Sequence, residues 1–296
     1  MSLRLLVNPA AGRGAGARHL QRLQALAADF GTGPPRISAG PDDLVREARA
    51  AAGEGIERLL VAGGDGTVHH VAQGLAGSGC ALCLVPLGSG NDLAGTLGLP
   101  RSLPEAFRRA VTGPVRRIDL LRAGGRVAVG YVGLGFDAEV ARRAAAPPGA
   151  RPGLVRGPLI YPWAVLSTLA GFAPPRLRVA WEGGAFDGAA MFAVCANLPR
   201  FGGGMRIAPA ARIDDGLLDL VVVRAVPRRT LLAVFPKVYR GRHVGHPAVT
   251  IARTPWAEIA ADRPLELYGG GEPMHELAPG APVRVEVVPG GLAVAC

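Results

Sequence analysis

The chain has 296 residues, a hydrophobic content of 49% and a formal net charge of +10 at neutral pH. This length and composition fit a globular protein of two domains and exclude a mainly disordered chain. The excess of positive charge favours anionic partners such as nucleotides and acidic lipid surfaces, whereas no helix-turn-helix or RNA-binding pattern accompanies it, so we expect no nucleic-acid partner.

The cysteines and the chain start indicate a cellular compartment. Cys80, Cys83, Cys195 and Cys296 lack the spacing of a disulfide framework or a zinc site, and we interpret the first two as buried strand thiols. The first residues have no signal-peptide pattern, and no apolar run approaches about 18 residues. We therefore expect a cytoplasmic protein without a membrane-spanning helix, which can bind peripherally to an acidic membrane. The sequence leaves a homodimer open.

Taken in order, the chain begins with a predicted strand, Leu3 to Val7, which leads directly into Asn8-Pro9-Ala10-Ala11-Gly12. A helix is expected from about Ala17 to Ala28, then a short strand from Arg36 to Ser38 and a helix from Pro41 to Ala52. Ligands of open α/β sheets bind in loops at the carboxyl ends of strands, so Asn8 is a candidate ligand residue. The other interpretation is a turn residue before proline.

A glycine-rich loop, Gly63-Gly64-Asp65-Gly66-Thr67, follows the apolar run from Leu59 to Ala62 and precedes a segment of helical apolar spacing. Glycines let backbone N–H groups at a helix N-terminus approach a phosphate, and a carboxylate within the loop suits Mg²⁺ beside phosphate oxygens. This pattern predicts a site for a magnesium nucleotide. A glycine turn with Asp65 as helix cap is the alternative.

A second loop of the same kind, from Pro86 to Ala94, follows the strand Leu82 to Val85 and contains Asp92. After a helix from about Leu103 to Val111, a third acid, Asp119, lies within the strand Arg117 to Leu121. This repetition of strand, loop and helix predicts a parallel sheet with its ligand loops at one edge.

From about Arg122 the pattern changes to short β-like runs separated by turns, which predicts an antiparallel sandwich. The runs are 127–129, 177–181, 191–196, 218–223 and 283–288. Helices are expected at 138–145, at 161–169 and at 231–239, the last interrupted by Pro236. An irregular loop is expected from Ala146 to Pro162 because it has five prolines.

The ordered motifs resemble the soluble diacylglycerol kinase catalytic family, which includes bacterial lipid kinases and sphingosine kinases. The resemblance covers nearly the whole chain. Besides the loops above it rests on Gly133-Leu134-Gly135-Phe136-Asp137-Ala138, Asn197, Phe201-Gly202-Gly203-Gly204-Met205, Ile207-Ala208-Pro209 and Asp214-Asp215-Gly216-Leu217-Leu218-Asp219.

The resemblance implies an α/β nucleotide-binding domain of the NAD kinase and phosphofructokinase type over residues 1–121, to which 289–296 return. Residues 122–288 would form an antiparallel β-sandwich that binds the substrate. ATP and Mg²⁺ are the implied cofactors. The implied nucleotide contacts are Asn8, Gly12, Gly63, Gly64, Asp65, Gly66, Thr67, Gly88, Ser89, Gly90 and Asn91. Asp65, Asp92 and Asp119 would organise magnesium directly or through water, and Asp215 with the Leu217 backbone would form a second, structural magnesium site.

The chain departs from the family at positions that bear on catalysis. Gly270-Gly271-Glu272 stands where the family has Asp-Gly-Glu, so the presumed general base is replaced by Gly270. His69 and His70 replace a usual Asn-Glu pair, and Tyr131 replaces a usual Asn. We therefore expect Asp65, with Glu272 and His70 as substitutes for the base, to carry the catalytic roles, and His275 is a further candidate base.

Three functional hypotheses follow. The first is an ATP-dependent kinase that phosphorylates a hydroxyl of a lipid or an amphipathic alcohol, which we favour because phosphoryl transfer depends mainly on positioning and electrostatics. The second is a nucleotide-binding protein that has lost phosphotransfer with the base. The third is a kinase-like enzyme of specialised metabolism in which the transfer is redirected.

Overall fold

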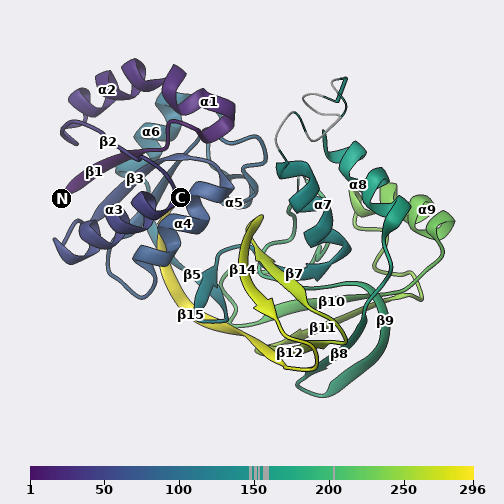
Figure 1. Cartoon of the computed structure of the whole chain (residues 1–296). Coiled ribbons are helices and arrows are strands. Elements are labelled where there is room, and N and C mark those ends of the chain that lie inside the picture. The colour runs from purple at the N-terminus through teal and green to yellow at the C-terminus, as the bar shows by residue number, and fades with distance from the viewer. Residues whose placement is uncertain (147–148, 150–151, 153, 156–159, 203) are drawn as a thin grey trace.

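The computed structural model describes residues 1–146, 149, 152, 154–155, 160–202 and 204–296. Its N-terminal part contains a parallel sheet of four strands in the order β4-β3-β1-β2, with loops at the carboxyl ends meeting at one edge (Figure 1). The strands are β1 (Leu3–Val7), β2 (Arg36–Ile37), β3 (Arg58–Gly63) and β4 (Ala81–Pro86). The predicted parallel α/β arrangement is thus confirmed.

Helices cover both faces of this sheet. They are α1 (Ala11–Arg18), α2 (Leu20–Asp29), α3 (Pro41–Gly53), α4 (Asp65–Leu75), α5 (Asp92–Thr96) and α6 (Leu103–Thr112). In β3, Leu59 and Val61 pack against α3 and α4, while Leu60 and Ala62 pack against α2 and α6. A strand buried on both faces explains the continuous apolar run in the sequence.

The helix expected from Ala17 to Ala28 is two helices, divided at His19, whose backbone leaves the helical region. The expectation of one helix was therefore wrong, and the segment contains no glycine or proline at the division that could have indicated it. The first part of α1 is a left-handed turn through Gly12, Arg13 and Gly14, so the regular helix starts after Gly14.

The second part is an antiparallel sandwich, as predicted. One layer has the order β14-β13-β7-β9-β10-β11, and the other is formed by β9, β8, β12 and β15. The long strand β9 belongs to both layers, because its first residues pair with β8 and its last residues pair with β7 and β10. The strands are β5 (Val115–Ala123), β6 (Arg126–Ala128), β7 (Tyr131–Gly135), β8 (Arg176–Trp181), β9 (Gly184–Ala196), β10 (Leu218–Arg224), β11 (Val249–Thr254), β12 (Trp256–Ala261), β13 (Leu265–Gly269), β14 (Glu272–Leu277) and β15 (Val283–Ala295).

Three helices, α7 (Phe136–Ala145), α8 (Ile160–Gly171) and α9 (Arg228–Val238), pack on the outer face of the layer that contains β10. The helix α9 begins three residues before the predicted start and continues through Pro236. Pro236 lies on the exposed side, where water can satisfy the carbonyl that loses its helical partner.

The irregular loop predicted for 146–162 lies largely outside the described residues. Its last three residues belong to α8, where Pro162 occupies the first turn, a position that does not require its N–H.

The strand β15 connects the two parts of the molecule (Figure 1). Its first half pairs with β12, Val294 pairs in parallel with Leu82 of β4, and β5 runs antiparallel beside it almost throughout. The register of the β5–β15 pair shifts between Val288 and Leu292. The boundaries 1–121 with 289–296, and 122–288, stay predictions.

Two expectations about buried groups and membranes can be compared with the structure. Cys80 and Cys83 are buried and free, as predicted for strand thiols. Among the described residues no helix has the length and apolar character needed to cross a bilayer.

Candidate functional site

The loops after β1, β3 and β4 meet at one edge of the parallel sheet. The Asn8 side-chain amide donates a hydrogen bond to Thr67 Oγ1 at 2.9 Å, and Asn8 Oδ1 accepts one from the Ala10 backbone at 3.1 Å. The Leu87 N–H donates to the Gly63 carbonyl at 2.8 Å. These bonds hold the three loops in one fixed arrangement at the N-terminus of α4.

Glycine is required in these loops because their backbones are in contact. A Cβ atom on Gly64 would lie 2.7 Å from Cα of Gly88, and one on Gly12, whose φ is +57°, would lie 1.9 Å from the Leu87 carbonyl oxygen. No side chain fits into such a space without displacing the neighbouring loop. The loops at Gly12, Gly64 and Gly88 thus form a tight cradle at the N-terminus of α4, and a glycine-rich loop at a helix N-terminus suits phosphate.

Asp65 lies where the cradle meets α5. Its Oδ1 accepts hydrogen bonds from the backbone N–H groups of Asp92, at 2.9 Å, and Leu93, at 3.4 Å. Burial raises the pKa of Asp65, and these backbone hydrogen bonds oppose that rise. A Cβ on Gly90 would lie 2.8 Å from Asp65 Oδ2 and 3.6 Å from Asp92 Oδ2, so the two carboxylates share one small space.

Asn91 fixes the second loop through its own backbone. Its φ of +52° is left-handed, which asparagine tolerates better than most residues. The side chain accepts from the Gly88 N–H at 2.9 Å and donates to the Gly88 carbonyl at 2.7 Å. Asn91 therefore shapes the loop, and whether it also contacts a nucleotide stays a prediction.

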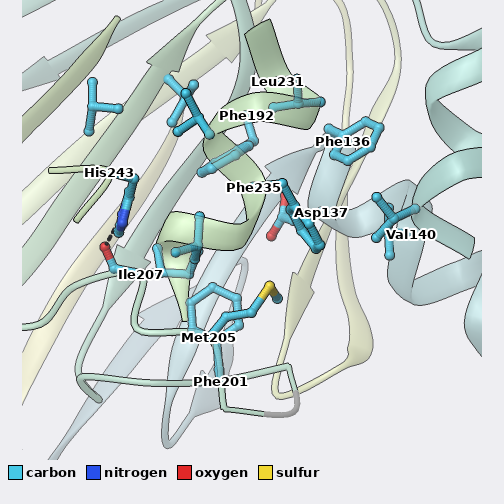
Figure 2. Close-up of a pocket in the computed structure, with 15 residues that line it drawn as sticks. Phe136, Asp137, Val140, Phe192, Phe201, Met205, Ile207, Leu231, Phe235 and His243 are labelled. Atoms are coloured by element: carbon cyan, nitrogen blue, oxygen red, sulfur yellow. Dashed lines mark hydrogen bonds between the residues drawn. The ribbon is translucent and has the colours of Figure 1, made fainter. Parts of the chain in front are cut away.

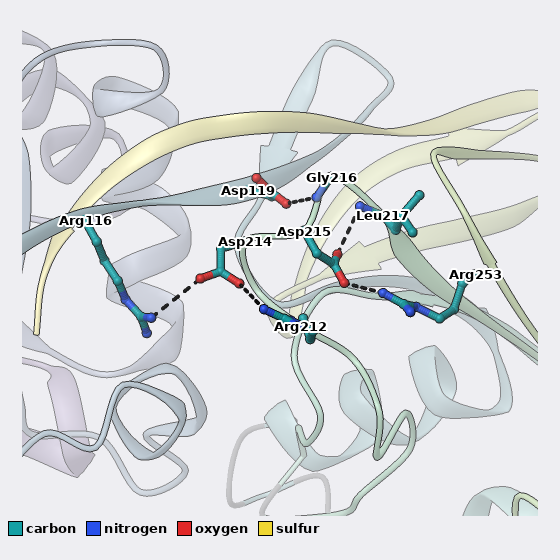
Figure 3. Close-up of polar contacts among 8 residues, drawn as sticks. All are labelled: Arg116, Asp119, Arg212, Asp214, Asp215, Gly216, Leu217 and Arg253. Carbon is teal, nitrogen blue, oxygen red and sulfur yellow. Dashed lines mark hydrogen bonds and ion pairs between the residues drawn. The ribbon is translucent and has the colours of Figure 1, made fainter.

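Asp119 has partners outside this group. Its carboxylate accepts hydrogen bonds from the backbone N–H groups of Gly216 and Gly290, both at 2.7 Å, and it is almost fully buried. Figure 3 shows the bond from Gly216. Among the described residues, no three His, Cys, Asp or Glu side chains are grouped so that they could hold a metal ion. The direct cluster of Asp65, Asp92 and Asp119 is thus not formed, and a link through water stays a prediction.

The predicted second metal site also has protein partners in the structure. Asp215 Oδ1 accepts the Leu217 N–H at 3.1 Å, and its other oxygen contacts the Arg253 guanidinium (Figure 3). Asp214 beside it pairs with Arg116 and Arg212. Because Arg253 already balances the Asp215 charge, a cation would have to displace it, and the metal role of Asp215 and Leu217 stays a prediction.

A cavity of about 370 Å³ opens beside the cradle, and both parts of the molecule line it. Glu272 of the β13–β14 hairpin reaches into it, since a Cβ on Gly66 would lie 3.0 Å from Glu272 Oε1. His70 lines the same cavity; burial lowers its pKa and the nearby Glu272 charge opposes this. Other lining residues are Asn8, Ala10, Ala11, Gly12, Gly40, Pro41, Leu44, Gly64, Asp65, Gly66, Thr67, Gly88 and Ser89.

The turn that presents Glu272 consists of Gly270 and Gly271, with φ of +60° and +88°. Two positive φ angles between paired strand ends are the geometry of a type I′ hairpin turn. A Cβ on Gly270 would lie 3.4 Å from Nδ1 of His69. His69 is buried, neither ring nitrogen has a partner, and burial lowers its pKa to about 4. His275 lies against Gly124 and does not line the cavity, so the structure does not support it as a base.

A second, apolar cavity of about 70 Å³ lies between the sandwich and its three outer helices (Figure 2). Aromatic and aliphatic side chains line it, among them Phe136, Phe192, Phe201, Met205, Leu231 and Phe235. Asp137 points into it, and its Oδ1 is out of contact with solvent and has no hydrogen-bond partner. Burial raises the pKa of Asp137 to about 7.

Asp137 was not predicted as a site residue, although it belongs to the motif Gly133 to Ala138 that contributes to the family resemblance. The signal was an acid directly after a strand in an apolar context. His243 also lines this cavity, with one ring nitrogen 3.0 Å from the Ile207 carbonyl oxygen and the other without a partner.

The fold and the site define a class: an α/β domain with glycine-rich loops at its strand ends, joined to a β-sandwich whose hairpin enters the same cavity. Residues 2–123 match the diacylglycerol kinase catalytic domain, and residues 130–296 match the YegS C-terminal NAD kinase beta sandwich-like domain. The chain belongs to the diacylglycerol kinase catalytic domain family.

Individual proteins agree with this. The chain is 32% identical over 268 residues to a "Probable lipid kinase YegS-like" of Chromohalobacter salexigens, covering 88% of this chain and 82% of the relative. It is 31% identical over 297 residues to a "Diacylglycerol kinase" of Mycobacterium tuberculosis, covering 98% and 93%. The crystal structure of a diacylglycerol kinase from Bacillus anthracis has the same fold, with a TM-score of 0.74 at 20% identity over 99% of this chain and 96% of that one.

The cradle with Asp65 and Asp92 is the predicted site of Mg·ATP, and this generates a first prediction. Asp65→Asn should weaken Mg·ATP binding at least tenfold while the fold is kept, because the amide oxygen can still accept from Asp92 and Leu93 but carries no charge for the cation. Isothermal titration with Mg·ATP measures the affinity, with Asp29→Asn on α2 as a control. Unchanged affinity in Asp65→Asn would contradict this assignment.

A second prediction concerns Asp137 and pH. Between about pH 4, its ordinary pKa, and about pH 7, the folded state keeps the proton that the unfolded state has lost. The contribution of Asp137 to the free energy of unfolding should therefore fall as pH rises through this window, by at most about 1.4 kcal/mol per pH unit, and level off above it.

Asp137→Asn lacks this titration, so its stability relative to the wild type should improve across the window. Thermal unfolding at a series of pH values measures this, with Glu139→Gln, a half-exposed acid on the same helix, as the control. Parallel curves for the wild type and Asp137→Asn would show that burial of the Asp137 carboxyl is not linked to folding.

Proposed function

We propose that the protein transfers the terminal phosphoryl group of ATP to a hydroxyl of a lipid or an amphipathic alcohol. The observation that supports this most strongly is the cavity lined both by the glycine cradle of the α/β domain and by Glu272 of the sandwich. A phosphoryl donor held by one domain and an acceptor held by the other would meet there. The kinase names of the relatives favour this hypothesis over a protein that only binds nucleotide.

The nucleotide would lie in the cradle, with backbone N–H groups at the start of α4 directed at its phosphates. Asn8 and Thr67 hold the loop positions, while Gly64 and Gly88 allow the close approach. Ser89 and the other predicted nucleotide contacts lie in the same loops. Asp65 and Asp92 are the proposed ligands, directly or through water, of a magnesium ion, which would neutralise phosphate charge during the transfer.

Glu272 and His70 are the proposed acceptors of the hydroxyl proton. Both side chains line the cavity, and Glu272 reaches it beside Gly66 in the first turn of α4. The lowered pKa of His70 keeps its imidazole neutral near pH 7, as a base requires, and the Glu272 carboxylate can orient the hydroxyl or take its proton. Gly270 can do neither.

The acceptor would place its apolar part toward the sandwich and its hydroxyl at Glu272. The apolar cavity under α8 and α9 is the proposed site for that part, once these helices separate enough to admit a chain. Contact with an anionic membrane is proposed as the route by which a lipid acceptor is reached, in keeping with the charge of +10.

Measurement of ADP release tests the function and identifies the acceptor. Purified protein, Mg·ATP and a panel of acceptors in neutral detergent should give turnover with at least one lipid or amphipathic alcohol and little without acceptor. Asp65→Asn is the control for contaminating kinases. Absence of turnover across diacylglycerols, monoacylglycerols and long-chain amino alcohols, with Mg·ATP still bound, would favour a binding function instead.

The third prediction concerns the missing base. Position 270 has a left-handed backbone, which Asp and Asn tolerate at modest cost, so Gly270→Asp and Gly270→Asn form a pair that differs in the carboxylate alone. General-base catalysis typically contributes about 10²–10⁴-fold, so Gly270→Asp should raise kcat well above Gly270→Asn with unchanged ATP affinity.

If these groups accept the proton, Glu272→Gln and His70→Ala in the wild-type background should each lower kcat and change KM much less. Their effects should shrink in the Gly270→Asp background, where the new carboxylate takes over. Steady-state kinetics on one acceptor measures the wild type, the four single variants and the two double variants with Gly270→Asp. If activity survives both Glu272→Gln and His70→Ala, neither residue is the substitute base.

A further inference from the structure

The surface segment between Asp219 and Glu258 has an unusual charge. Residues 220–257 contain no carboxylate, and their basic residues are Arg224, Arg228, Arg229, Lys237, Arg240, Arg242 and Arg253. The net charge of this stretch is therefore +7, which is most of the net charge of +10 of the whole chain. The positive charge is therefore concentrated around α9 and the turn that follows it.

Arg253 pairs with Asp215 and Arg224 lies over the Phe186 ring, whereas the other five cations have no such partner among the described residues. Elsewhere, surface arginines pair with acids, as in Arg4 with Glu54, Arg122 with Glu286 and Arg176 with Asp187. In contrast, the exposed side chains of α9 and its following turn make no ion pair or hydrogen bond with any residue that the structure describes: Arg228, Arg229, Lys237, Arg240 and Arg242. Their charges are available to an outside partner.

Large apolar side chains are exposed among these cations. Leu232 and Tyr239 are each 44% exposed, and Val244 is 39% exposed. On the neighbouring helix α8, Leu166 is 56% exposed. Cations interleaved with exposed aliphatic and aromatic groups are typical of helices that lie in the headgroup region of a bilayer. A nucleic acid would use the cations but gain little from leucine and valine.

The inner side of the same helix lines the apolar cavity. Leu231, Phe235 and Val238 of α9 line that cavity together with Val165 of α8. Figure 2 shows Leu231 and Phe235 there. A helix whose outer side meets headgroups and whose inner side lines an apolar cavity separates the bilayer from the proposed acceptor site by a single layer of structure.

We infer that α9 and the turn after it, residues 228–244, form the surface by which the protein adsorbs to an anionic bilayer. This inference rests on the proposed function for its purpose, because a lipid acceptor is what the surface would provide. The headgroup phosphates pair with the five free cations, and Leu232, Tyr239 and Val244 enter the boundary of the acyl region. Binding then falls with salt, since headgroup attraction fades beyond a Debye length of about 8 Å at physiological ionic strength.

The fourth prediction compares two triple variants with the same loss of charge. One is Arg229→Gln with Lys237→Gln and Arg240→Gln on the proposed surface. The control is Arg22→Gln with Arg49→Gln and Arg108→Gln, three exposed arginines of the α/β domain that have no ion pair with a described residue. None of the six side chains lines the cavity beside the cradle or the apolar cavity. Arg49 lines a separate open hollow on α3.

Co-sedimentation with vesicles of phosphatidylcholine and phosphatidylglycerol measures binding, with phosphatidylcholine alone as reference. The α9 triple should bind about 100-fold more weakly than the wild type, because each basic residue at the surface contributes roughly a factor of five. The control triple should stay within a fewfold of the wild type. Circular dichroism and thermal unfolding verify that both variants are folded.

Equal losses in the two triples, or wild-type binding by the α9 triple, would overturn the inference. So would tighter binding of the α9 surface to a single-stranded oligonucleotide than to the anionic vesicles. Turnover with an acceptor dispersed in neutral detergent separates this result from the proposed function: the α9 triple should keep wild-type activity there. A wild type that binds vesicles through α9 but turns over no acceptor in detergent would contradict the function and leave the surface intact.

Discussion

The buried carboxylate of Asp119 is the interaction on which the arrangement of the two domains depends. It lies on β5, and its oxygens accept the N–H groups of Gly216, in the turn before β10, and Gly290, at the register shift of β15. Charge-assisted hydrogen bonds in a buried place are strong, and loss of one partner leaves a buried group unpaired at a cost of about 1–3 kcal/mol or more. One side chain thus ties together the strands that cross between the domains.

The geometry of the cavity beside the cradle depends on how this junction holds the two domains. The glycine cradle belongs to the parallel sheet, whereas Glu272 is carried by a hairpin of the sandwich that pairs with β7. A small rotation about the β5–β15 pair would move Glu272 relative to Asp65 and His70. Phosphoryl transfer requires donor and acceptor within a few tenths of an ångström of the reactive geometry, so a rigid junction is a condition for the proposed chemistry.

Much of this could be predicted from local pattern. Leu5 to Val7 and Leu59 to Ala62 indicate buried strands because a parallel sheet covered on both faces requires continuous apolar residues, and the cradle follows from the glycines in the loops after them. The partners of Asp119 could not be predicted, because they lie 97 and 171 residues away in the chain. The break at His19 has no glycine or proline to mark it, and the continuity of α9 through Pro236 depends on which side of the helix faces water.

The hairpin that carries Glu272 shows how a turn of two glycines positions a side chain at the cavity. Two glycines in succession adopt the paired positive φ angles of a type I′ turn without strain, so the turn is formed by backbone preference alone. Glu272 pairs with Gly269 directly after this turn, which fixes where its side chain enters the cavity. The space beside Gly270 is bounded by the buried ring of His69, whose nitrogens have no partner. Gly270 therefore offers no proton acceptor itself, while the turn that it forms with Gly271 holds Glu272 at the edge of the cavity.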